Sequence, residues 1–414
     1  MTTRGGTLHA PDAPADATVG DREPAPTRLP LVVYVLALGT FLMGTTEFVV
    51  AGLLPEIAND VRISVAQAGL LITVFAVGMI VGAPLMAMLT LRLPQRSTLA
   101  LALGVFAVGH IVVALGSSFT LLLAARFLTA LATGAFWAVA NVVAAQAAGP
   151  AASSRALGVV GAGAMLANVV GVPLGAFAGQ LMGWRGPFWA LAVLAVAAMA
   201  LIARHVARDA DGHQAISVRA ELSALRSGRL WLALAACATT TGGVLSTYSY
   251  VSPLLTDRAQ LAAGLVPLVL VGFGSGALAG FLVGGRLGDH RPHATTITAA
   301  ATTTVLLLAL CLLSGYAAPT IALIALLGLF GLGANPVLIS LGVRFAGRAP
   351  TLGSALTVSA FNLGTAIGSW IAGLALGSPL GATGPAAVGA AIAALTLIPT
   401  TAIAVVQRRR SAAT

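Results

Sequence analysis

The sequence contains no lysine, only two cysteines and little charge of either sign. Of its 414 residues, 8% are charged and 58% are hydrophobic. Soluble globular proteins are about 25% charged and about 45–50% apolar. The shortage of charge therefore excludes a soluble domain, a soluble enzyme and a disordered scaffold, and it predicts a polytopic membrane protein.

The missing residue types also exclude several kinds of site. A Gly-x-x-x-x-Gly-Lys phosphate loop cannot exist without lysine, which argues against an ATP-driven pump within this chain. Cys237 and Cys311 stand singly in apolar stretches, and this spacing indicates neither a disulfide nor a metal site. No His-Glu-x-x-His motif occurs in the sequence. We expect neither a cofactor nor a metal.

Twelve apolar stretches are long enough to cross a bilayer as helices, which takes about 20 residues each. We therefore predict an all-α membrane protein with twelve transmembrane helices. The expected spans are residues 31–53, 68–89, 98–116, 120–145, 156–181, 188–206, 230–251, 265–287, 295–314, 319–341, 352–376 and 386–406.

A charged stretch in the middle of the chain divides these spans into two groups. The expected segments are a disordered cytoplasmic tail at 1–30, an N-terminal six-helix bundle at 31–206, a cytoplasmic linker at 207–229, a C-terminal six-helix bundle at 230–406 and a cytoplasmic tail at 407–414. The first tail has no apolar run to bury. Apolar residues at helical spacing in 216–230 fit either a short amphipathic helix on the membrane surface or a solvated linker.

The arginines indicate which way the spans run. All 22 basic residues are arginine, against 12 acidic residues. With the N-terminus inside, 18 arginines fall on the inner side, whereas Arg62, Arg185 and Arg258 fall on outer loops and Arg126 within a span. Positive charge on cytoplasmic loops sets the orientation of membrane proteins. We therefore expect both termini in the cytoplasm, and the net charge of +10 needs no nucleic-acid partner.

The two groups of spans resemble each other. A shift of 198 residues aligns landmarks of the first two spans with those of spans seven and eight: Gly44 with Gly242, Pro55 with Pro253, Phe75 with Phe273, Gly78 with Gly276, Gly82 with Gly280 and Pro94 with Pro292. This pattern predicts two pseudo-symmetric halves. Such a duplication, with a substrate site between the halves near the middle of the membrane, is typical of transporters that work by alternating access.

One acidic residue lies inside the predicted hydrocarbon region. The other acids fall in the tail, the linker or loops, or at the end of a span, but Glu47 sits within the first span. Burying a carboxylate in a membrane is costly, and such residues commonly take up and release protons. A purely structural alternative is a permanently protonated, hydrogen-bonded Glu47.

Arg126 is the one basic residue within a span, and we place it at a depth similar to that of Glu47, in the outer half of the bilayer. A cation there favours the charged form of a nearby carboxylate. The alternative for Arg126 is snorkelling to the outer interface.

For His110, in span three, the alternatives are a packed, hydrogen-bonded side chain and a proton relay. Polar residues that are candidates either for lining a cavity or for holding helices together are Asn141, Asn168, Tyr248, Tyr250, Asn335 and Asn362.

Several motifs resemble those of a known family. They are Gly44-Thr45-Thr46-Glu47-Phe48 with Gly52-Leu53-Leu54-Pro55, Arg126 with Gly134, Gly171-Val172-Pro173-Leu174-Gly175, Tyr248-Ser249-Tyr250 and Phe361-Asn362-Leu363-Gly364. Over residues 31–406, the chain is similar to the drug:proton antiporter-1 group of the major facilitator superfamily. It resembles most closely the bacterial chloramphenicol exporters and their arabinose- and nucleoside-exporter relatives.

The resemblance implies roles for individual residues. Glu47 takes the place of the family's proton-coupling carboxylate, and Arg126 that of the arginine implicated in proton transfer. Gly171, Pro173 and Gly175 match the antiporter motif that bends the fifth span. The family works in the bacterial inner membrane, with protons, a small-molecule substrate and the lipid bilayer as partners, and we expect a monomer.

One motif departs from the family pattern. The loop between spans two and three keeps Arg92 and Arg96, but Leu91 replaces the expected Asp and Pro94 the expected Gly. The second half keeps an acid at the corresponding place, Asp289. We expect Asp289 to pair with Arg286 or Arg291 as a latch for one conformation, the alternative being a solvated charge at the rim.

The two halves and the membrane-embedded Glu47 predict a proton-coupled transporter that works by alternating access. The resemblance alone implies that it exports a small amphiphilic drug, such as chloramphenicol. An alternative on the same fold is the export of sugars or nucleosides. A membrane-embedded enzyme would need several reactive groups facing one cavity, and the single intramembrane acid argues against it. A sensor that does not transport is a further alternative.

Overall fold

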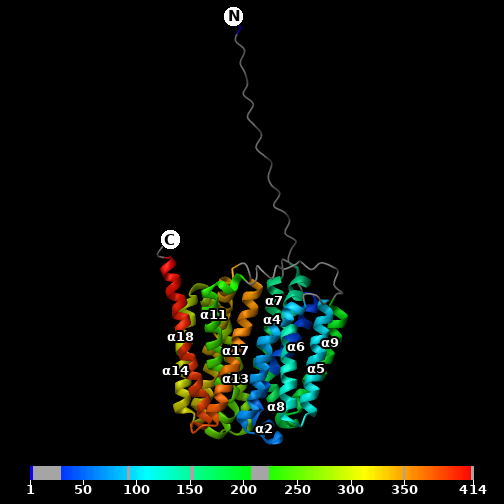
Figure 1. Ribbon diagram of the computed structural model, residues 1–414, viewed down its shortest axis with the longest axis vertical. Helices are drawn as coiled ribbons and strands as arrows, with labels where there is room; N and C mark the ends of the chain where they lie inside the picture. The colour runs from blue at the N-terminus through cyan, green and yellow to red at the C-terminus, as the bar shows by residue number, and fades with distance from the viewer. Residues whose placement is uncertain (3–28, 91–93, 150–152, 207–222, 348–349, 412–414) are drawn as a thin grey trace.

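The computed structural model describes residues 1–2, 29–90, 94–149, 153–206, 223–347 and 350–411. In these residues every regular element is helical. Twelve segments are long and apolar enough to cross a membrane, and each overlaps one of the spans predicted from the sequence. The helices run side by side in one bundle, and the last helix ends on the same side as the first begins (Figure 1).

The elements of the first half supply the first six spans. They are α1 (Leu31–Val49) with η1 (Val50–Gly52), α2 (Leu54–Val61), α3 (Val65–Ala68), α4 (Leu70–Thr90), α5 (Gln95–Leu115), α6 (Phe119–Ala148), α7 (Ser153–Leu166), the π-helical turn η2 (Ala167–Gly171), α8 (Val172–Met182) and α9 (Gly186–His205).

The second half supplies the other six spans. Its elements are η3 (Ser223–Arg226), α11 (Gly228–Ser249), α12 (Val251–Pro253), η4 (Leu254–Arg258), η5 (Ala263–Leu265), α13 (Val266–His290), α14 (Pro292–Leu313), α15 (Ala317–Gly331), α16 (Asn335–Phe345), α17 (Pro350–Leu376), η6 (Gly381–Thr383) and α18 (Gly384–Ser411). Most of the tail predicted at 1–30 and of the linker predicted at 207–229 lies outside the described residues.

The same packing pattern occurs twice. In the first half, α1 packs on α7, α4 on α6 and α5 on α9. The corresponding pairs in the second half are α11 with α17, α13 with α15 and α14 with α18. The halves meet where α4 contacts α17 and where α8 contacts α13, which are equivalent pairs when the halves are exchanged. The prediction of two pseudo-symmetric six-helix bundles is confirmed.

Glycines shared by the two halves explain the close pairing of α4 with α6 and of α13 with α15. A Cβ on Gly78 would overlap Ala130, and one on Gly276 would overlap the main chain at Ala325. Lipid tails are as apolar as leucine, so transmembrane helices associate through close packing, and small residues permit it. The matched positions therefore build the same helix pair twice.

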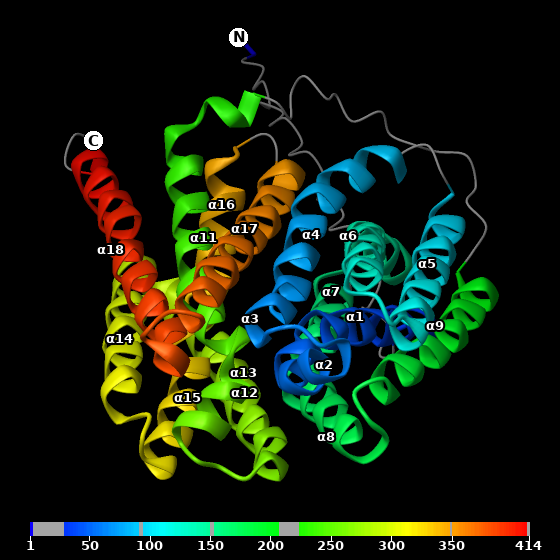
Figure 2. The same cartoon turned by 60° about the horizontal axis from the view of Figure 1, so that its bottom comes forward.

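The apolar core differs between the two ends of the bundle. We call the end where α18 finishes the terminal face and the end that carries α2 the far face; Figure 2 turns the far face forward. Near the far face, one buried cluster joins both halves and includes Leu53 and Leu270. Toward the terminal face, the clusters are separate, one around Phe136 in the first half and one around Leu338 in the second. The shared cluster thus packs the two halves together near the far face.

Candidate functional site

A cavity of about 220 Å³ lies between the two halves. The first half contributes α1, α4, α6, α7 and η2. The second half contributes α11, α13, α16, α17 and the connection between α15 and α16. The lining residues are Glu47, Phe48, Met79, Trp137, Met165, Asn168, Thr241, Leu245, Tyr248, Phe273, Leu332, Asn335, Val358, Phe361, Asn362 and Thr365. The acid singled out in the sequence therefore faces a cavity between the halves.

Four of the six predicted polar candidates line this cavity, namely Asn168, Tyr248, Asn335 and Asn362. The other two lie elsewhere. Asn141 is exposed on α6, one turn beyond Trp137, and its amide reaches back to the Trp137 carbonyl at 3.4 Å. Tyr250 is buried near the far face, where its hydroxyl donates to the Ser369 carbonyl at 3.1 Å.

Aromatic side chains form the apolar wall beside Glu47. Phe48 meets Tyr248 edge-on with ring centroids 6.0 Å apart, and Tyr248 stacks on Phe273 at 4.3 Å. The cavity also contains unpaired polar atoms. Among the described residues, Asn335 Oδ1, Asn362 Oδ1 and Trp137 Nε1 are buried without a hydrogen-bond partner. Because buried polar groups are normally paired, these atoms are available to a bound molecule.

Arg126 lies behind Glu47 rather than on it. Its side chain is 1% exposed, and its Nη1 donates to the carbonyl and to the Oγ1 of Thr46, both at 3.0 Å. The guanidinium also lies 4.2 Å above the Phe75 ring, and Nε donates to the Leu71 carbonyl at 3.4 Å. Because α1 and α4 hold the guanidinium inside the bundle, it does not snorkel to the far face.

Glu47 and Arg126 are close but not paired. Arg126 is bound to Thr46, the residue next to Glu47, yet no nitrogen of Arg126 lies within 4.0 Å of a Glu47 carboxylate oxygen in the described structure. The Nη2 atom of Arg126 is buried and has no hydrogen-bond partner among the described residues. The guanidinium thus retains unused donors next to the carboxylate.

His110 extends the network to α5. The ring is buried, its Nδ1 lies 2.7 Å from the Phe106 carbonyl, and its Nε2 lies 2.7 Å from Thr46 Oγ1. Thr46 therefore connects Arg126 to His110. In the sequence Thr46 stands out only as part of a motif, because a threonine in a helix usually bonds to its own helix and gives no sign of a distant partner.

The fifth span places α1 and thereby Glu47. The π-helical turn η2 interrupts the span just before Pro173, whose backbone nitrogen carries no hydrogen and cannot donate a hydrogen bond. Side chains at Gly171 and Gly175 would overlap Thr45 and Val49, the residues two before and two after Glu47. The glycines therefore let this span lie directly against the turn of α1 that carries the acid.

The predicted latch is described only in part. Arg92 lies outside the described residues, and the side chain of Asp289 is not described. Arg96 is half-buried at the start of α5, and Arg286 and Arg291 are exposed at the end of α13 and just beyond it. The pairing of Asp289 with Arg286 or Arg291 stays a prediction.

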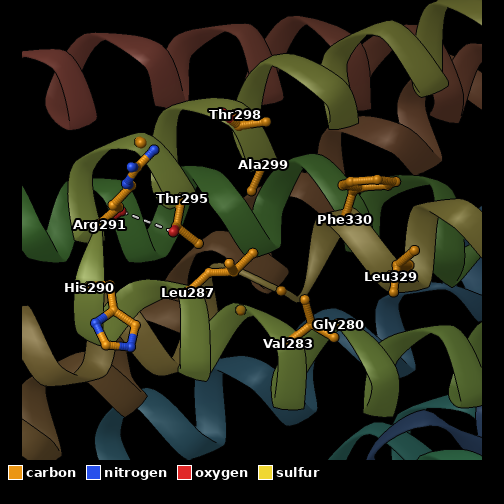
Figure 3. A pocket seen from close by; sticks show the side chains of 13 residues that line it. Gly280, Val283, Leu287, His290, Arg291, Thr295, Thr298, Ala299, Leu329 and Phe330 are labelled. Atoms are coloured by element: carbon orange, nitrogen blue, oxygen red, sulfur yellow. Dashed lines mark hydrogen bonds between the residues drawn. The ribbon is translucent and has the colours of Figure 1, made fainter.

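A larger hollow of about 520 Å³ lies within the second half, among α13, α14 and α15. It is lined mainly by glycine and apolar side chains, with His290 and Arg291 at one end (Figure 3). Thr295 Oγ1 donates to the Arg291 carbonyl at 3.0 Å. No residue of the first half lines this hollow. It therefore does not lie between the two halves, where alternating access would expose a site first to one side of the membrane and then to the other.

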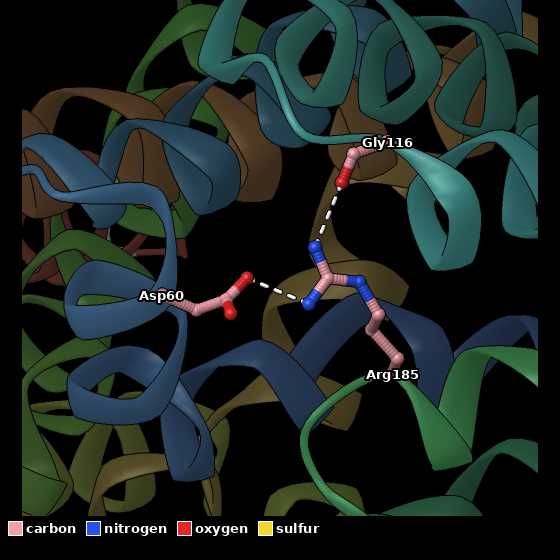
Figure 4. Close-up of polar contacts among 3 residues, drawn as sticks. All are labelled: Asp60, Gly116 and Arg185. Atoms are coloured by element: carbon pink, nitrogen blue, oxygen red, sulfur yellow. Dashed lines mark hydrogen bonds and ion pairs between the residues drawn. The ribbon is translucent and has the colours of Figure 1, made fainter.

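At the far face an ion pair joins three parts of the first half (Figure 4). Arg185 Nη1 lies 2.6 Å from Asp60 Oδ2, and Nη2 donates to the Gly116 carbonyl at 3.0 Å. The contacts link α2, the connection between α5 and α6, and the connection between α8 and α9. The sequence predicted Arg185 on an outer loop.

Two similar six-helix bundles with a cavity between them are the architecture of many secondary membrane transporters. The chain belongs to the Major Facilitator Superfamily, because the sequence pattern that defines this family matches residues 36–369. It is therefore a multi-pass membrane transporter of small molecules and not an enzyme.

Two curated relatives cover nearly the whole chain. A chloramphenicol resistance protein of Streptomyces lividans is 36% identical over 375 residues, which is 89% of this chain and 95% of the relative. The inner membrane transport protein YdhP of Escherichia coli (strain K12) is 33% identical over 363 residues, 88% of this chain and 93% of the relative.

A solved structure shares the fold. The crystal structure of a bacterial homologue of the human lysosomal transporter Spinster, in an inward-facing and occupied conformation, aligns with a TM-score of 0.72. The alignment covers 92% of this chain and 96% of that one at 17% identity. The resemblance to the major facilitator superfamily stated from the motifs is thus confirmed.

Proposed function

We propose that this protein exports a small amphiphilic drug, chloramphenicol or a related antibiotic, in exchange for protons. The observation that carries the proposal is the position of Glu47, an acid on the wall of a cavity between two halves with an incompletely bonded arginine behind it. The similarity to a chloramphenicol resistance protein supports the choice of substrate.

The cavity suits a neutral, partly aromatic molecule. The Tyr248 and Phe273 rings offer stacking surfaces, while Asn335 and Asn362 offer buried carbonyl oxygens and Trp137 an N–H group. Specific ligand sites combine an apolar lining with a few placed polar groups. We assign substrate contact to these residues and to Asn168, whereas Asn141 and Tyr250 lie outside the cavity and take no part in it.

In this proposal, the hydrogen-bond partner of Arg126 changes when Glu47 gains or loses its proton. With Glu47 protonated, Arg126 keeps its bonds to Thr46, as it has here. Loss of the proton leaves a carboxylate in an apolar wall, and the free Nη2 donor can then turn to it. A ligand shifts a conformational equilibrium only by its difference in affinity for the two states, so binding of a proton or of drug must favour different states.

We assign the terminal face to the cytoplasm of a bacterial inner membrane. The arginines of the sequence concentrate on that side, as the positive-inside rule requires, and a relative is named as an inner membrane protein. The far face, where both halves share one apolar cluster, is then the closed outer side. On this assignment Glu47 faces inward, where it releases its proton and meets drug from the cell. The transporter acts as a monomer in this proposal.

The experiment measures the uptake of a panel of substrates into everted membrane vesicles whose interior is more acidic than the medium. We expect chloramphenicol uptake by the unchanged protein and a loss of about tenfold or more with Glu47→Gln, because a neutral amide cannot carry the proton. Asp257→Gln serves as a matched control that removes an acid from a far-face turn.

Each result has a definite meaning. Undiminished gradient-driven uptake with Glu47→Gln would contradict the proton-coupling role. If pentoses or nucleosides are taken up and chloramphenicol is not, the substrate assignment is wrong while the coupling mechanism stands.

A further inference from the structure

We infer that His110 is a positioning residue that acts through Thr46 to hold Arg126 off the carboxylate of Glu47. The inference deepens the proposed function and rests on it, because it concerns how the proton-carrying acid is kept ready to change its state. The observations that carry it are three hydrogen bonds in series and one unused donor.

The first step is the direction of the hydrogen bonds at His110. A backbone carbonyl only accepts, so the 2.7 Å contact with the Phe106 carbonyl places a hydrogen on Nδ1. In a neutral ring, Nε2 is then an acceptor, and the Thr46 hydroxyl 2.7 Å away donates to it. A doubly protonated ring would put a second buried cation around the hydroxyl that already serves Arg126, which is costly to bury.

The second step concerns the lone pairs of Thr46. Because its proton points to His110, the hydroxyl presents lone pairs to Arg126 Nη1 at 3.0 Å, next to the Thr46 carbonyl that accepts from the same nitrogen. The two acceptors bind one end of the guanidinium. Phe75 holds its face and the Leu71 carbonyl its Nε, so Nη2 is left without a partner in the described structure.

The third step is a competition between two acceptors for Arg126. Thr46 and Glu47 are adjacent in α1, and the guanidinium is bonded to the first and not to the second. The ionisable groups that surround Glu47 in the described structure are Arg126 on α6, His110 on α5 and Tyr248 on α11. The cavity residues from α4, η2, α13 and α17 carry apolar, amide or hydroxyl side chains and no charged group. Arg126 is therefore the one cation whose reorientation would stabilise the Glu47 carboxylate.

The test measures protonation of Glu47 without any substrate. Dicyclohexylcarbodiimide reacts with protonated carboxyl groups in apolar sites, and peptide mass spectrometry of the purified full chain reports the labelling of Glu47 against pH. Thr46→Val removes the hydroxyl and keeps the shape, so Arg126 loses one of its two acceptors on Thr46 and can turn to Glu47. We expect the pH of half-maximal labelling to fall by about one unit.

Companion variants separate positioning from packing. His110→Phe keeps the ring contacts with Phe106 and Phe188 but removes the acceptor, and we expect its half-maximal pH to move in the same direction. Thr46→Ser keeps the hydroxyl and should leave the pH unchanged. Because both effects pass through one hydroxyl, the double variant Thr46→Val with His110→Phe should shift no further than Thr46→Val alone.

An unchanged half-maximal pH in both Thr46→Val and His110→Phe, with lowered melting temperatures, would overturn the inference and leave the chain of bonds as packing only. Equal labelling of the Glu47 site at every pH in the unchanged protein would instead overturn the proton role of Glu47, and the inference with it. Loss of coupled transport in Glu47→Gln, measured separately, tells the two failures apart.

Discussion

At the scale of single residues, Arg126 is a full cation that the protein buries in the membrane and satisfies with main-chain and hydroxyl acceptors. The Thr46 carbonyl, Thr46 Oγ1 and the Leu71 carbonyl take three of its hydrogen bonds. A buried charge is tolerated only where such partners exist. The geometry of the planar guanidinium is thus part of the site.

Arg126→Lys should strongly reduce coupled transport although it keeps the charge. A lysine ammonium is a point donor on a flexible stem and does not reach across α1 and α4 as the planar fork does. We expect chloramphenicol uptake in everted vesicles to fall about tenfold or more, since one lost charged hydrogen bond is worth about 1.5–3 kcal/mol. Arg258→Lys, on the far-face turn η4, is the matched control. Equal uptake by the two variants would refute the geometric role of Arg126.

A second prediction at this scale concerns Glu56, in α2 outside the spans. Burial raises the pKa of its carboxyl above the ordinary value, against the opposing effect of a backbone hydrogen bond. A raised folded-state pKa means that charging costs stability as pH rises through this range, and the cost persists above it. Glu56→Gln should therefore raise the melting temperature at pH 8 and change it little near pH 4. The same gain at both pH values would contradict this linkage.

At the scale of elements, the helix pairs depend on glycine at closest approach. A Cβ on Gly276 would overlap the Ala325 carbonyl of α15, which is main chain and cannot turn aside. Gly158 of α7 has nothing within 4 Å of the same position. The two sites therefore form a matched pair of helical glycines, one packed and one open.

Gly276→Ala should destabilise the second half by about 1–3 kcal/mol, the usual cost of overpacking. Gly158→Ala should be neutral or slightly stabilising, because alanine is the better helix former. Thermal unfolding of the two purified variants in detergent measures the difference. Equal melting temperatures would show that α13 and α15 can separate at no cost.

The span boundaries belong to this scale too. The lengths of the apolar runs predicted all twelve spans, because a bilayer demands about 20 apolar residues whatever the neighbours are. The π-helical turn η2 and the division of the tenth span into α15 and α16 depend on which helices pack beside them. The hydrophobicity of a stretch does not depend on such local changes in helix geometry, so the sequence could not locate them.

At the scale of the whole molecule, the far face is where the two halves hold together. Gln180 Nε2, at the end of α8, donates to the Ala263 carbonyl at the start of η5, at 2.6 Å. Tyr250 of the second half fills the space beside Gly69 of the first. Opening toward the far face requires these contacts to separate.

Cross-linking the far face should therefore stop transport. In a Gln180→Cys, Ala263→Cys double variant, a short bismaleimide should join the two halves, whose neighbouring positions 180 and 263 are in contact here. We expect uptake to fall to background after cross-linking, whereas Gln180→Cys alone treated with the same reagent keeps its uptake. Full uptake by the cross-linked protein would rule out separation of the halves at this point.

The sequence by itself determined the number of spans, the duplication and the isolation of Glu47 and Arg126, because hydrophobic length, repeated landmarks and buried charge are local properties of the chain. Four of the six polar candidates that it singled out line the cavity. Only the tertiary structure decided that Arg126 bonds to Thr46 and not to Glu47, that His110 completes the series, and that Asn141 and Tyr250 face elsewhere. These outcomes depend on the rotation of each helix about its axis, which is set by packing against helices remote in the sequence.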